Sequence, residues 1–145
     1  MITATCLLIL AYLLVGKDIK PLLKKLKGVD WQSLFAEVFD KIKIYSAKAG
    51  RFATKPLITF YYVLKDGDLS LTEKAMIYGC ILYVISPVSI IPQSVFKILG
   101  VMDESAAVLF VYKKIKDKIT PAIAQEVEYT LNKWFDEVKY YEVIE

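Results

Sequence analysis

The residues best suited to chemistry surround two prolines in an otherwise apolar stretch. Between Ala75 and Met102 the only charged side chain is Lys97, and Pro87 and Pro92 lie in the middle of this stretch. The polar side chains around this corner are Ser86, Ser89, Gln93, Asp103 and Glu104. Hydroxyl and amide groups can satisfy backbone groups that prolines leave unpaired, whereas adjacent carboxylates are oxygen ligands of the kind a hard cation prefers. Since Asp103 also suits the N-cap of a following helix, the corner has a structural and an ion-binding interpretation, and both remain open.

The composition argues against most enzyme classes. The 145 residues include no histidine, so the commonest general base and metal ligand is missing. Cys6 and Cys80 lie far apart in apolar runs, without zinc-site or C-x-x-C spacing, and we expect free buried thiols. No glycine-rich phosphate loop or nucleophile elbow occurs. We therefore expect a non-enzymatic protein with no catalytic residue, no metal, no cofactor and no nucleic-acid partner.

Two apolar helices joined by a tight corner must position the polar residues. Ser70 and Glu73 form a capping box, which predicts a helix from Leu71 to about Ile85. After the corner, a short helix over 93–99 and another over 104–119 are expected. The residues predicted to form and end the corner are Pro87, Pro92 and Gly100. This hairpin either enters a bilayer or lies in the centre of a helical bundle.

The N-terminal segment 1–28 combines an apolar run with a basic flank. Residues 1–16 carry no charged side chain, which is a little short of the roughly 20 residues that cross a bilayer. The run is either an uncleaved anchor or a helix docked in the core. The lysines that follow it are Lys17, Lys20, Lys24, Lys25 and Lys27. We expect them to contact anionic lipid, and in the anchored case to lie on the cytoplasmic side.

The remaining segment, 29–145, is predicted to be a helical domain. An amphipathic helix follows Asp30 and ends at Gly50, and an aromatic-rich helix has Pro56 in its first turn. A last helix begins at Pro121, with Thr120 as its N-cap. The last helix places one apolar face at Ile123, Val127, Leu131, Trp134 and Val138. No strand-like alternation persists anywhere. The expected fold is all-α, a small bundle of about six helices built around the proline-bounded apolar hairpin.

The corner sequence resembles a known family. The run YVISPVSIIPQ over residues 83–93, followed by GVMDE over 100–104, is similar to the YkvA-like family, domain of unknown function 1232. Its core reads approximately Y-x-x-S-P-I-D-L-I-P-D, then G-x-x-D-D, and the resemblance covers about residues 48–135. Two family aspartates are Ser89 and Gln93 here, and Glu104 replaces a third. The resemblance implies a small helical, commonly membrane-associated protein; any cation binding by the family's acids is lost or altered.

Three functions are compatible with these features. The first is a non-enzymatic membrane or membrane-associated protein in the cytoplasmic membrane, with most of the chain in the cytoplasm, acting by scaffolding or interaction. Its partners would be membrane lipid and a protein partner or second copy. The second is a soluble cytoplasmic bundle that binds a protein or lipid through an apolar groove. The third is a small transporter or channel subunit that uses the polar corner.

Overall fold

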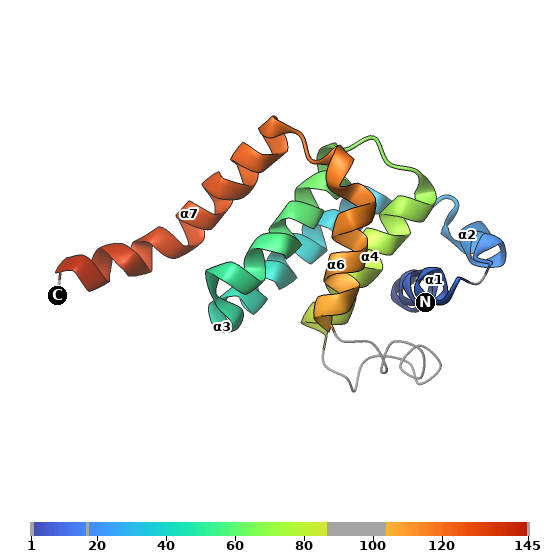
Figure 1. Cartoon of the computed structure of the whole chain (residues 1–145), viewed down its shortest axis with the longest axis horizontal. Helices are drawn as coiled ribbons and strands as arrows, with labels where there is room; N and C mark the ends of the chain where they lie inside the picture. Colours follow the sequence, from blue (N-terminus) through green and yellow to red (C-terminus); the bar gives the residue numbers. More distant parts are fainter. Residues whose placement is uncertain (1, 17, 87–103, 145) are drawn as a thin grey trace. The chain divides into compact units, whose positions relative to one another are not determined.

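The computed structural model describes residues 2–16, 18–86 and 104–144, and all regular elements in these ranges are helices (Figure 1). They are α1 (Ile2–Val15), α2 (Lys20–Leu26), α3 (Trp31–Asp66), α4 (Leu71–Ile85), α6 (Glu104–Ile115), the 3-10 helix η2 (Lys116–Lys118) and α7 (Pro121–Ile144). The all-α prediction is confirmed. The predicted helix over 93–99 and the corner residues Pro87, Pro92 and Gly100 lie outside the described residues.

Two compact units make up the chain, and each combines segments distant in sequence. The first comprises residues 1–31 and 68–116, and the second comprises residues 32–67 and 117–145. The first unit therefore contains α1, α2, α4 and α6, whereas the second is built mainly from α3 and α7. The predicted division into segments 1–28 and 29–145 stays a prediction.

Helix α4 is the central helix of the first unit. All nine residues from Ala75 to Tyr83 are buried, and α1, α2 and α6 contact this helix. A helix that is apolar around its whole circumference becomes buried on all sides. Its start is fixed by the predicted capping box: the Glu73 backbone N–H donates to Ser70 Oγ at 3.2 Å, and the Ser70 N–H donates to Glu73 Oε1 at 3.0 Å.

Helix α1 packs on α4. Its buried residues are Thr5, Cys6, Leu7, Ile9, Leu10 and Ala11. With 14 residues α1 is about 21 Å long, against roughly 30 Å of bilayer hydrocarbon. Across the described residues, we find no helix with the length and apolar character that a membrane crossing requires. The transmembrane anchor is therefore not supported, and the burial of α1 matches the alternative of a docked helix.

Helix α3 consists of two arms that meet at Gly50. This residue has φ 86° and ψ 172°, a conformation open essentially only to glycine, so the predicted end of a helix at Gly50 is confirmed. The predicted restart at Pro56 is wrong, because helical structure resumes directly after Gly50. Pro56 lacks an N–H for the Phe52 carbonyl, but Phe52 is 96% exposed, so water can reach that part of the chain.

The second unit is held together by α3 and α7. The Phe39 ring lies 4.7 Å from the Tyr61 ring and 5.3 Å from the Trp134 ring, centroid to centroid. The predicted apolar face of α7 is confirmed at Ile123, Val127 and Leu131, which are buried, and at the half-buried Trp134; the side chain of Val138 lies outside the described residues. The predicted start of α7 is also confirmed, since the Ile123 N–H donates to Thr120 Oγ1 at 3.2 Å.

Candidate functional site

The predicted polar corner is described only at its two ends. Ser86 ends α4, where its backbone N–H donates to the Leu82 carbonyl at 2.9 Å and its own backbone is extended, with φ −89° and ψ 139°. Glu104 is the exposed first residue of α6, a position where a carboxylate complements the helix dipole. Both observed positions are those of helix-terminal residues.

The other predicted corner residues lie outside the described part of the chain. They are Ser89, Gln93 and Asp103, with Pro87, Pro92 and Gly100. The described residues therefore test neither the structural nor the ion-binding interpretation of the corner. Among the described residues, no three carboxylate or thiol groups gather in the way a bound metal ion would need.

The predicted lipid-contact lysines lie on α2, a short helix with opposite faces of different character. Leu26 is buried and Leu22 and Leu23 are half-buried, and the helix contacts α1 and α4. The exposed residues are Lys20, Lys24, Lys25 and Lys27; Lys17 lies outside the described residues. The spacing i, i+4 puts Lys20 and Lys24 on neighbouring positions of one helical surface, and Lys27 is the C-cap that follows the helix. The leucines serve internal packing, and the lysines face solvent.

The start of α2 is determined locally. The Asp18 carboxylate accepts the Lys20 backbone N–H at 3.0 Å, and Pro21 occupies the first turn, where its missing donor costs nothing. The end is set by Gly28, whose φ of 83° turns the chain away. Four lysines therefore lie within the eight residues from Lys20 to Lys27.

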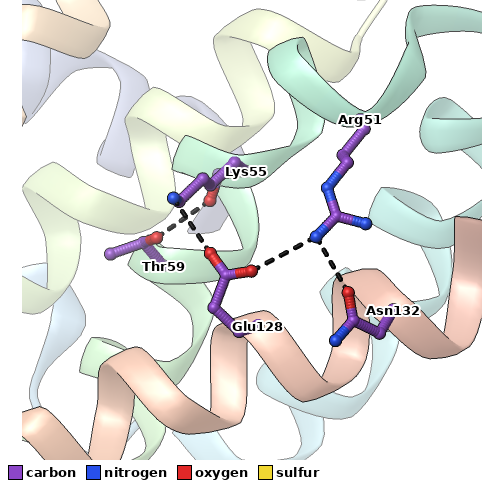
Figure 2. Close-up of polar contacts among 5 residues, drawn as sticks. All are labelled: Arg51, Lys55, Thr59, Glu128 and Asn132. Atoms are coloured by element: carbon purple, nitrogen blue, oxygen red, sulfur yellow. Dashed lines mark hydrogen bonds and ion pairs between the residues drawn. The ribbon is translucent and has the colours of Figure 1, made fainter.

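A second cluster of charged residues joins α3 to α7, and its ion pairs were not predicted from the sequence. The Glu128 carboxylate on α7 lies between two cations of α3: Oε1 is 3.0 Å from Lys55 Nζ, and Oε2 is 3.2 Å from Arg51 Nη2 (Figure 2). The same Arg51 nitrogen donates to Asn132 Oδ1 at 2.9 Å. The hydrogen bond and charge of Lys55, and then Arg51, lower the pKa of Glu128 below its usual value. In the sequence, the one sign of this cluster is that Glu128 and Asn132 are four residues apart, which places them on the same face of a helix.

The two cysteine thiols are buried, and their protonated form is favoured. Cys6 and Cys80 are fully buried and free. Burial raises the pKa of each thiol to about 12, because the thiolate would lose its hydration. The thiolate is the nucleophilic and metal-binding form, and burial disfavours this form at both cysteines.

Comparison with known proteins places the central helix in a family. A family model described as "Protein of unknown function (DUF1232)" matches residues 73–110. Over this stretch the chain is similar to the DUF1232 family. The resemblance expected from the sequence is thereby confirmed over these residues, about a quarter of the chain. No curated protein and no solved structure matches the chain.

The DUF1232 region comprises most of α4, the first half of α6 and the residues between them. Within it, α4 is buried along Ala75–Tyr83 and contacts α6, whereas the matched part of α6 includes the exposed Glu104 and Leu109. Both basic surfaces lie outside the DUF1232 region, at residues 18–27 and 51–55. The family match therefore does not cover the lysines of α2 or the cations of α3.

Proposed function

We propose that the protein is a non-enzymatic helical protein that docks on an anionic membrane surface through the exposed lysines of α2. The observation that carries this proposal is the division of α2 into buried leucines and exposed lysines. Because the leucines are used in internal packing, the contact with lipid is electrostatic docking without insertion of α2. The surface bound is the cytoplasmic face of the membrane, with the chain on the cytoplasmic side, where anionic headgroups attract basic segments.

The strength of such docking follows from the number of lysines. A lysine near an anionic leaflet contributes about 1 kcal/mol, and the attraction falls off within a Debye length of roughly 8–10 Å. Four exposed lysines between residues 20 and 27, with Asp18 as the nearest acid, supply a local excess of positive charge. Binding of this kind weakens with added salt, which separates it from insertion of an apolar helix.

The test is co-sedimentation of the full chain with vesicles of phosphatidylcholine alone or mixed with phosphatidylglycerol. We expect binding only to the anionic vesicles, with about 5- to 30-fold weaker binding for Lys20→Gln/Lys24→Gln. Lys113→Gln/Lys116→Gln is the matched control, because it removes the same charge from exposed positions of α6 and η2. Equal losses in the two variants would mean that only net charge matters and would contradict a specific contact at α2.

A second candidate, binding of a protein partner or of a second copy, is favoured by α6. Leu109 is 53% exposed and Tyr112 is 45% exposed, and they lie one turn apart. Sedimentation velocity over a range of concentrations tests self-association. If the protein associates, Leu109→Ser should return it to a monomer. If the wild-type protein is a monomer at all concentrations, self-association is contradicted, and only a different protein partner could bind this surface.

A further inference from the structure

Phe52 is the most exposed large hydrophobic side chain among the described residues. It is 96% exposed and lies in α3, two residues after the break at Gly50. Single exposed apolar side chains are ordinary on protein surfaces and need no function. Phe52 differs from an ordinary exposed side chain because of the residues around it.

Phe52 lies in a segment that is basic and free of acidic residues. Between Lys41 and Lys65 the chain contains no aspartate or glutamate. The cations of its first fifteen residues, all exposed, are Lys41, Lys43, Lys48, Arg51 and Lys55. Arg51 directly precedes Phe52, and Lys55 follows it one helical turn later. Ile44, in the arm before Gly50, is also 69% exposed.

Ion pairs leave this segment with an excess of positive charge. Glu37 pairs with Lys41 at 3.3 Å, and one carboxylate, Glu128, is shared by Arg51 and Lys55. Counted with these two acids and with the exposed Asp40, which directly precedes Lys41, the five cations leave a net charge of +2. Such a combination of cations and exposed apolar side chains complements an anionic bilayer, whose headgroups attract the cations and whose interface accepts the apolar groups.

We propose that the α3 segment around Phe52 is a second contact with anionic lipid, in which the Phe52 ring enters the headgroup region. This inference rests on the proposed membrane function but concerns other residues, in the other compact unit. Basic surfaces with aromatic rings also bind single-stranded nucleic acid by stacking. The exposed Ile44 favours lipid, because an aliphatic side chain has no π face on which a base can stack.

The first experiment measures binding of full-length variants to phosphatidylcholine–phosphatidylglycerol vesicles. We expect Phe52→Ala to bind about tenfold more weakly, from loss of the buried ring, and Phe52→Trp to bind at least as tightly as the wild type. Tyr129→Ala is the matched control, because Tyr129 is an aromatic residue of the same unit, 66% exposed, but flanked by Glu126 and Glu128. Circular dichroism verifies that Phe52→Ala is folded.

The second experiment detects insertion directly. Phe52→Cys is labelled with an environment-sensitive fluorophore, while Cys6 and Cys80 stay unreactive because they are buried. Anionic vesicles should increase the emission of this label, and spin-labelled lipids should quench it. The same label at Gln125, an exposed residue of α7, should show neither effect.

The outcomes separate this inference from the proposed function. If the wild-type protein does not bind anionic vesicles, both the proposed function and this inference are contradicted. Weak binding by Lys20→Gln/Lys24→Gln with unchanged binding by Phe52→Ala overturns the inference alone. Weak binding by Phe52→Ala with unchanged binding by the lysine variant supports the inference and contradicts the α2 contact. A Phe52→Ala protein that binds vesicles normally but loses binding to a single-stranded oligonucleotide also overturns it.

Discussion

Gly79 of α4 lies directly against the backbone of Cys6 in α1. A Cβ atom at position 79 would be 2.5 Å from the Cys6 carbonyl oxygen, 2.9 Å from its carbonyl carbon and 3.4 Å from Leu10 Cβ. The first two neighbours are backbone atoms, which cannot swing aside as the end of a flexible side chain can. The absence of a side chain at Gly79 therefore allows the close approach of α1 to the central helix.

Gly79→Ala should destabilise the protein by about 1–3 kcal/mol, because the added methyl group forces the two helices apart. In a helix without this contact, the same change stabilises by up to about 1 kcal/mol. Urea unfolding followed by circular dichroism measures the difference. Ala47→Gly, at an exposed position of α3, calibrates the ordinary helical effect. A more stable Gly79→Ala protein would contradict the close contact.

The buried thiols should resist modification in the native protein. With each pKa raised to about 12, Cys6 and Cys80 remain protonated at pH 8 and are shielded from reagents. We expect two thiols to react with Ellman's reagent in denaturant and almost none without it. Because the raised pKa belongs to the folded state, the associated stability is complete below the usual thiol pKa near 9.0 and is lost as the pH rises towards 12. Fast native-state labelling would show that the α1–α4 interior opens.

Gly50→Ala should destabilise by about 1–3 kcal/mol, because φ 86° with ψ 172° is strained for any residue with a Cβ. No neighbouring atom would clash with that Cβ, so the loss reports backbone conformation alone. Thermal unfolding of Gly50→Ala is compared with that of Ala53→Gly, which gives the cost of glycine at an exposed helical position nearby. An increase in stability for Gly50→Ala would indicate a continuous helix through this position.

A buried hydrogen bond joins α3 to α7. The Tyr62 hydroxyl and Thr130 Oγ1 lie 2.7 Å apart, and both residues are buried. Tyr62→Phe should lower the free energy of unfolding by about 1–3 kcal/mol, since the threonine loses this partner. Tyr62→Phe/Thr130→Val should lose less than the sum of the single changes. Strict additivity in this double-mutant cycle would show that the two hydroxyl groups do not interact.

Glu128 should titrate below its usual value near 4.5, because Lys55 and Arg51 favour its charged form. Carbon-13 NMR of the side-chain carboxyl group measures this pKa. Lys55→Gln should raise it more than Arg51→Gln does, since Lys55 is the larger cause. The associated stability is complete above the unfolded-state pKa and is lost as the pH falls through the folded-state pKa. An unchanged pKa in Lys55→Gln would exclude the ion pair in solution.

Local signals in the sequence predicted much of the secondary structure. The capping box at Ser70 and Glu73, the cap at Thr120 before Pro121, and the break at Gly50 all lie where the sequence placed them. Each is a short-range effect, in which one side chain bonds to a nearby backbone group or one residue admits a special conformation. The prediction at Pro56 was wrong, because proline removes a single helical hydrogen bond, and the surrounding helix tolerates that loss.

The sequence by itself determined the all-α fold, the apolar central helix and the basic character of residues 17–27. Only the tertiary structure decided that α1 packs on α4 at Gly79 and Cys6, that Glu128 pairs with Lys55 and Arg51, and that Phe52 is exposed. Hydrophobic periodicity predicts which residues are buried, but it does not predict which helix packs against them. That choice depends on shape and close packing between segments far apart in the chain.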